Sequence, residues 1–256
     1  MKRNLSSCLV AACVLACLGS VASVASAAIV TQPGGLNPGE QYRLVFVTSQ
    51  ETYGRYYKRG TTDLTGGPID IAGYNTFATG VAESVTELSD LGTTWKAVVS
   101  TEQPPPGGGT LFSAKANTGT DPNVETGVAI YNLAGELVAS NNADLWDGSI
   151  SNAIDVDELG NGPVDQSTNS SGQYLVWTGT GADGTGNGDT SLVAPSGGYI
   201  RYGHADLTDD HWIARVGDRS GWNANNETNS AMPIYVMSGV LTAEIPEPRR
   251  PLIKLK

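Results

Sequence analysis

The segment Tyr42-Arg43-Leu44-Val45-Phe46-Val47-Thr48-Ser49 decides the fold of this 256-residue chain. Aromatic and β-branched residues dominate it, and such residues favour the pleated backbone of a β-strand. We therefore expect residues 42–49 to form a central strand, with the other elements arranged around it.

An amphipathic helix is expected after this strand. Apolar residues recur at three- and four-residue steps between about Asp70 and Leu88, which is the spacing of one helix face. These residues are Ile71, Tyr74, Phe77, Ala78, Val81 and Val85. Pro68 before the segment and Gly92 after it suit the two ends of a helix, so one long helix is predicted.

Short strands are predicted along the rest of the chain, separated by turn-forming segments. They lie at residues 95–100, at 128–140 as a hairpin around Ala134-Gly135-Glu136, and at 174–178, 211–216 and 233–241. Residues 179–210 are poor in apolar side chains and are expected to form either a functional or a disordered loop. The sequence has no internal repeat and no sign of a second core, so residues 28–242 are predicted to be one globular domain.

The chain begins like an exported protein. Met1-Lys2-Arg3 is basic, an apolar stretch follows, and Ala25-Ser26-Ala27 offers the small residues that a signal peptidase accepts. Residues 1–27 are therefore predicted to be a signal peptide, and no membrane span is expected in the mature chain. Val14-Leu15-Ala16-Cys17 resembles a lipobox, so acylation at Cys17 is the alternative to simple cleavage.

Composition restricts the chemistry and the partners of the mature chain. Cys8, Cys13 and Cys17 all lie within residues 1–27, so neither a disulfide nor thiol catalysis is expected after cleavage. The ~230 remaining residues can bury a core without cross-links. The net charge of the whole chain is −11, and no basic patch offsets it. That charge argues against nucleic acid or an anionic membrane as a partner and is compatible with cation binding.

Several segments, taken in chain order, carry a family resemblance. They are Trp95-Lys96-Ala97-Val98-Val99-Ser100, 128–133, 135–138, Ala143-Asp144-Leu145-Trp146-Asp147-Gly148-Ser149, Val176-Trp177-Thr178-Gly179-Thr180 and Pro233-Ile234-Tyr235-Val236-Met237. With these segments, residues 40–242 resemble the endostatin-like branch of the C-type-lectin-like fold and, more closely, a family of exported bacterial proteins with such a domain. The resemblance implies an α+β domain with a mostly antiparallel sheet, one main long helix and a long irregular loop region that often carries ligand sites.

The C-terminal tail, residues 243–256, carries a second resemblance. Ile245-Pro246-Glu247-Pro248 is similar to the start of a PEP-CTERM sorting signal of Gram-negative exported proteins. Such a signal continues with an apolar helix, whereas Arg249-Arg250 follow here at once and the remaining segment is too short to cross a bilayer. The two termini together predict a secreted, periplasmic or cell-surface protein with a truncated sorting signal.

The sequence predicts no catalytic residue. Only His204 and His211 could supply an imidazole base, and neither Gly-x-Ser-x-Gly nor His-Glu-x-x-His occurs. Acidic residues gather at 155–158 and at 206–210, and paired carboxylates are what a glycoside hydrolase uses. A secreted carbohydrate-active hydrolase therefore stays open as an alternative.

A calcium site is the metal hypothesis. Asp183, Asn187 and Asp189 lie in a Gly-rich segment, and calcium prefers several oxygen ligands on flexible loops. Turns stabilised by Gly and Asp without an ion are the alternative. Calcium-dependent lectins of the resembled fold carry a Trp-Asn-Asp motif, but Ala224 follows Trp222-Asn223 here, so their sugar-coordinating calcium site is not expected.

The five tryptophans divide into two groups. The resemblance assigns three of them to the core, namely Trp95, Trp146 and Trp177. Trp212 and Trp222 border the long loop and are the candidates for exposure, where an aromatic ring can stack on a sugar. Together with Asp209 and Asp210 they form the predicted ligand-binding set.

These observations predict an exported, non-enzymatic binding or surface/matrix protein whose ligand is a glycan or another cell-surface protein. The alternatives are the secreted hydrolase with acidic catalytic residues and a purely structural component of the envelope.

Overall fold

The computed structural model describes seven stretches of the chain. They are residues 28–54, 70–102, 110–162, 174–187, 190–193, 200–215 and 231–244. The predicted signal peptide at 1–27 and the sorting-signal-like residues 245–250 lie outside the described residues.

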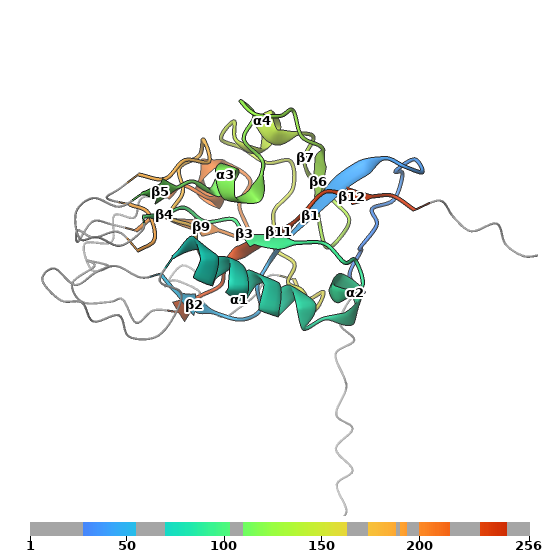
Figure 1. Cartoon of the computed structure of the whole chain (residues 1–256), viewed down its shortest axis with the longest axis horizontal. Helices are drawn as coiled ribbons and strands as arrows, with labels where there is room; N and C mark the ends of the chain where they lie inside the picture. Colours follow the sequence, from blue (N-terminus) through green and yellow to red (C-terminus); the bar gives the residue numbers. More distant parts are fainter. Residues whose placement is uncertain are drawn as a thin grey trace, which may run out of the picture.

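The main sheet is built around strand β1 (Gln41–Val47), as the sequence predicted (Figure 1). Its strands lie in the order β3-β11-β1-β6-β7, and β12 also pairs with β1. Their bounds are β3 Trp95–Ala97, β6 Ala129–Asn132, β7 Leu137–Ala139, β11 Tyr235–Ser238 and β12 Leu241–Thr242. Within this sheet β1 and β6 run parallel, whereas the other pairings are antiparallel. The expectation of an α+β domain with a mostly antiparallel sheet is therefore confirmed.

Strand β1 is central because both of its faces are apolar. Leu44 and Phe46 point into one hydrophobic core, whereas Val45 and Val47 point into a second core on the other face, since side chains alternate along a strand. All four are 0% exposed. A continuous apolar run of this kind is typical of a strand that is covered on both sides.

Helix α1 (Ile71–Glu83) covers the first of these cores and lies beside β3 (Figure 1). Asp70 caps its start by accepting a 2.7 Å hydrogen bond from the Gly73 amide. The predicted apolar face of this helix is confirmed, since Ile71, Tyr74, Ala78 and Val81 are buried. The prediction of a single helix that reaches Leu88 is wrong. Ser84 donates from its hydroxyl to the Val81 carbonyl, and Val85 is extended, so a separate short helix α2 (Thr86–Ser89) follows.

The remaining elements are short. The helices are α3 (Ala114–Thr118), α4 (Asn142–Leu145) and the 3₁₀ helix η1 (Asp210–Trp212). The two-stranded sheets pair β2 (Thr52–Tyr53) with β10 (Ala231–Met232), β4 (Thr101–Glu102) with β5 (Leu111–Phe112), and β8 (Leu175–Trp177) with β9 (Tyr202–His204). Among the described residues, no helix is long and apolar enough to cross a membrane.

Two expectations for the loop region need correction. Residues 179–210 are not simply a loop, because β9 lies within them and Leu192 is fully buried. The strand predicted at 211–216 is wrong, since η1 occupies its first two residues. Asp209 accepts a hydrogen bond from the His211 amide and so starts a tight turn where an extended strand was expected. The hairpin predicted at 128–140 is confirmed as β6 and β7.

Arg43 ties the centre of the sheet to helix α3. Its side chain is buried, and its guanidinium donates to the carbonyl oxygens of Thr118 (3.0 Å), Ser238 (2.9 Å) and Gly119 (3.3 Å). Burial lowers the pKa of Arg43, and the carboxylate of Glu125 at 3.8 Å opposes that shift. The three carbonyls accept from the two terminal guanidinium nitrogens, whereas the buried Nε atom has no hydrogen-bond partner in the described structure.

The three tryptophans assigned to the core are indeed buried, with Trp95 2%, Trp146 7% and Trp177 4% exposed. Glycines from distant parts of the chain lie against two of these rings. A Cβ atom on Gly184 would lie 2.7 Å from the ring of Trp146, and a Cβ atom on Gly54 would lie 2.6 Å from the ring of Trp177. The absent side chains therefore let the backbone lie against the indole rings.

Replacing Gly184 tests this packing. Gly184 has φ +76°, so Gly184→Ala combines backbone strain with overlap against Trp146 and should lower the free energy of unfolding by about 2–4 kcal/mol. Gly148 also has positive φ but nothing within 4 Å of its Cβ position, so Gly148→Ala should cost only about 1–2 kcal/mol. Urea unfolding measures both, and equal losses would contradict the packing argument.

Candidate functional site

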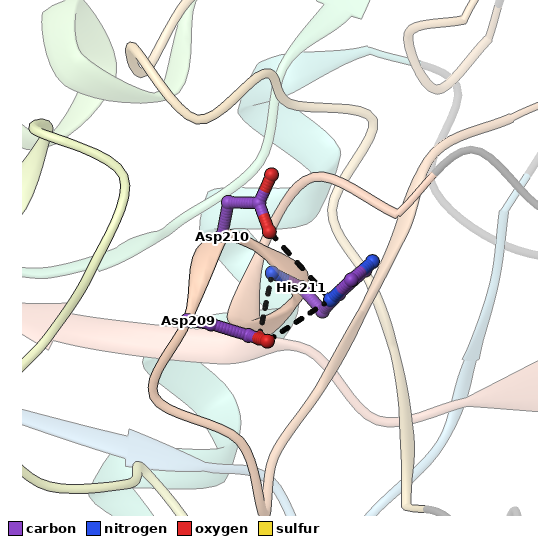
Figure 2. A group of neighbouring side chains, drawn as sticks. All are labelled: Asp209, Asp210 and His211. Carbon is purple, nitrogen blue, oxygen red and sulfur yellow. Dashed lines mark hydrogen bonds and ion pairs between the residues drawn. The ribbon is translucent and has the colours of Figure 1, made fainter.

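A polar cluster lies on the 3₁₀ turn η1 and consists of Asp209, Asp210 and His211 (Figure 2). The Nδ1 atom of His211 is 3.2 Å from Asp209 Oδ2 and 3.5 Å from Asp210 Oδ1. The side chains are 64%, 63% and 45% exposed, in chain order. One candidate ligand atom from each residue lies within 4.8 Å of the others, so the cluster presents two carboxylates and an imidazole to solvent.

The next residue, Trp212, holds this turn in place. Trp212 is 0% exposed, and its ring stacks on that of Trp146 with the ring centroids 5.9 Å apart. The ring of Tyr235 also packs against it, with the centroids 5.8 Å apart. The Tyr235 hydroxyl donates to the Trp212 carbonyl at 3.0 Å, and the Trp212 amide donates to the Asp209 carbonyl at 2.9 Å. The expected exposure of Trp212 is therefore wrong, because burying the large apolar ring is strongly favourable.

The hydrogen bonds of the cluster favour ionised carboxylate. Partial burial tends to raise the pKa of Asp209, but hydrogen bonds from the side chain and amide of His211 outweigh it and lower the pKa. Carboxylate oxygens and imidazole nitrogen are ligands that divalent cations accept. The same groups can also accept hydrogen bonds from hydroxyl or ammonium groups of a ligand.

The predicted calcium residues stand in successive turns. Asp183 accepts hydrogen bonds on Oδ1 from the Thr185 amide (3.1 Å) and hydroxyl (2.6 Å), and these bonds lower its pKa against the effect of partial burial. The backbone amide of Asn187 donates to the Ser191 hydroxyl at 3.0 Å. Asp189 lies outside the described residues, as does Trp222 of the ligand-binding set. The described turns are thus stabilised by their own hydrogen bonds.

His204 lies on β9 and is 0% exposed. Its Nε2 atom is 3.0 Å from the guanidinium of Arg215, and burial together with that positive charge lowers the pKa of His204 to about 4. Arg215 can only donate, so the proton of the neutral ring is on Nδ1, which has no hydrogen-bond partner in the described structure. His204 is thus a buried neutral residue.

The fold brings Asp155 of the first acidic segment close enough to Asp206 of the second for their charges to interact. Burial, together with the negative charges of Glu136 and Asp206, raises the pKa of Asp155. Glu158 is buried, accepts hydrogen bonds from the amide and hydroxyl of Ser49, and has a pKa that burial raises. Asp157 is also buried and accepts from the amides that follow it in a turn. Asp157 and Glu158 therefore stabilise the loop, and Asp155 is the half-buried carboxylate of this segment.

No protein-family model matches the sequence, and no curated protein matches it. Function must therefore be inferred from the residues and the geometry of the site.

The buried imidazole gives the protein a specific acid sensitivity. The folded-state pKa of His204 is about 4 against an ordinary 6.5, so the unfolded chain takes up a proton first as the pH falls. The stability that neutral His204 contributes is complete above pH 6.5 and is lost between pH 6.5 and 4, amounting to roughly 3 kcal/mol.

Replacing His204 by Gln should remove this part of the pH dependence, because the amide oxygen still accepts from Arg215 but does not titrate. Urea unfolding at several values between pH 7 and pH 4 measures the slope in wild type and variant. Identical slopes would show that His204 is not buried and neutral.

Proposed function

We propose that the protein is an exported, non-enzymatic binding protein with a C-type-lectin-like domain and that its ligand is a glycan or another cell-surface protein. The basic, apolar and small-residue segments at the N-terminus support export. The helix-flanked, mostly antiparallel sheet is of the kind that the resemblance implies. The proposed location is the cell surface, the periplasm or the surrounding medium.

One observation carries the binding proposal, namely the exposed Asp209–Asp210–His211 cluster mounted directly before a fully buried tryptophan. Binding groups on a rigid scaffold lose little conformational entropy when a ligand arrives. The Trp212 ring supplies that rigidity through its contacts with Trp146 and Tyr235. The cluster can therefore engage a ligand hydroxyl or a divalent cation without first being ordered.

Calcium is the cation we propose for a cation-assisted form of this site. Asp209 and Asp210 supply hard oxygen ligands, and a bound ligand can complete the coordination through its own hydroxyl groups. Asp183, Asn187 and Asp189 remain a second proposed calcium set, because one of its members lies outside the described residues.

Substituting both aspartates tests the proposal. In Asp209→Asn/Asp210→Asn, the amide oxygen at 209 can still accept from the His211 backbone, so the turn is retained while both charges are lost. Calcium at about 100-fold over the Kd of the η1 cluster should stabilise the wild type by ~2.7 kcal/mol more than the variant, in which only the second proposed calcium set is left. Asp147→Asn, an exposed carboxylate in another turn, is the matched control.

A glycan array and binding to intact Gram-negative cells, each with and without calcium, report on the ligand itself. Wild type and Asp147→Asn should bind, and the double variant should lose binding. Wild-type protein that binds neither the array nor cells would contradict the proposed function. Binding that survives in the double variant would instead remove this cluster from the site.

The hydrolase alternative is favoured by one observation, the raised pKa of Asp155 beside Asp206. A carboxyl group whose pKa is raised, beside a second carboxyl group, has one property of a glycosidase general acid. A polysaccharide digestion screen with wild type and Asp155→Asn distinguishes this reading, since only a hydrolase releases reducing ends that the substitution abolishes.

A further inference from the structure

A tight turn at residues 157–162 contains the sequence Asn161-Gly162. The Asp157 carboxylate organises this turn. Its Oδ1 atom accepts from the backbone amides of Leu159 (2.9 Å) and Asn161 (2.8 Å), and its Oδ2 atom accepts from the side-chain amide of Asn161 (3.1 Å). Asp157 is 2% exposed, whereas Asn161 and Gly162 are exposed. A surface Asn-Gly pair is therefore tied to a buried carboxylate.

An Asn-Gly pair can lose its side-chain amide without an enzyme. The Gly162 backbone nitrogen attacks the Cγ atom of Asn161, and the new C–N bond closes a five-membered succinimide ring. The side-chain nitrogen leaves as ammonia and carries away the proton of the Gly162 amide. Water then opens the ring at one of its two carbonyls and yields aspartate or isoaspartate, whose main chain runs through the side-chain carbon. Water is the only co-reactant.

Two features of Gly162 favour this attack. Glycine has no Cβ, so no side chain hinders the approach of its nitrogen. In addition, its backbone N–H donates no hydrogen bond within the part of the chain that the structure describes. Hydrogen-bonded amides exchange their protons slowly because the bond must first open, and the Gly162 amide does not have this protection.

The turn at Asn123 is an internal comparison. Asn123 is exposed as well, and its backbone and side-chain amides both donate to the Asp121 carboxylate at 3.0 Å. Val124 follows it, however, and a β-branched side chain crowds the backbone nitrogen beside it. The Val124 amide also donates to the Asp121 carbonyl at 2.9 Å. The two turns therefore differ in the nitrogen that would attack.

We infer that Asn161 is a site of spontaneous deamidation and isoaspartate formation, and that the modification loosens residues 157–162 from the end of the central strand. The lost side-chain amide is the donor to Asp157 Oδ2, and the carboxylate that replaces it repels the Asp157 carboxylate. Isoaspartate also lengthens the main chain where the Asn161 carbonyl accepts from the Asp157 amide at 2.9 Å. The next residue, Glu158, accepts from the amide of Ser49 just beyond β1 at 2.8 Å, so the disturbance reaches that strand.

Peptide mass spectrometry after incubation of the purified mature protein in mildly alkaline buffer tests the modification. The peptide with Asn161 should show the conversion of an amide to an acid and should become a substrate for an isoaspartyl methyltransferase, whereas Asn123 should keep its amide. Gly162→Ala should slow the conversion by roughly an order of magnitude, because a Cβ hinders the attack. The variant should keep its Tm, since Gly162 has no positive φ and nothing lies within 4 Å of its Cβ position. An Asn161 that stays unmodified over weeks, or equal rates in wild type and variant, would overturn the inference.

Asn161→Asp tests the structural consequence, with Asn123→Asp as the matched control. In urea unfolding, the ratio of folded to unfolded protein should fall at least about fivefold more in Asn161→Asp, because a buried acceptor loses its donor. Asp121 is only partly buried, so water can replace the donor that it loses. Equal losses in the two variants would contradict the loosening of the turn. Neither measurement uses a ligand, so both are independent of the proposed binding function.

Discussion

Leu44 and Phe46 face one hydrophobic core while Val45 and Val47 face the other, and none of the four side chains has exposed surface. A strand buried on both faces needs a layer on each side. Helix α1 supplies residues to the first core, and α3, α4 and the turn at Trp212 supply residues to the second (Figure 1). Arg43, the one charge in this strand, donates from its two terminal guanidinium nitrogens to carbonyls from β11 and from the end of α3. These contacts connect the sheet to helix α3, which belongs to the layer that covers the second core.

The second core determines how the proposed binding turn is presented. Trp146, Trp212 and Tyr235 come from three separate parts of the chain and pack together there. The turn that precedes Trp212 cannot move away without exposing its ring to water, which costs on the order of 2–3 kcal/mol.

Local sequence patterns were sufficient to predict the elements in which apolar residues recur at regular spacing. The apolar run at 42–49 predicted β1, and three- and four-residue spacing predicted the buried face of α1. That spacing continues through Val85, so it did not indicate the break that the Ser84 hydroxyl and the extended Val85 introduce. Strand β9 has three residues, which is too short for alternation to be recognised.

The candidate sites depended on contacts that the sequence does not display. Trp212 borders the long loop, and that position suggested exposure, whereas its burial comes from Trp146 and Tyr235. His204 gave no signal because its low pKa arises from burial and from Arg215, both products of the fold. The clustering of Asp209 and Asp210 was visible in the sequence, but their rigid mounting was not.

Native-state hydrogen exchange at the amides of Trp212 and Ile213 tests most directly whether the turn is part of the rigid scaffold. These amides donate to the carbonyls of Asp209 and Asp210. If Trp212 anchors the turn in the core, both amides exchange only through global unfolding, with the same opening free energy as Val45 and Val47 in β1. Fast exchange at Trp212 and Ile213 while β1 stays protected would show that the turn opens locally, and it would contradict a preorganised binding cluster at this position.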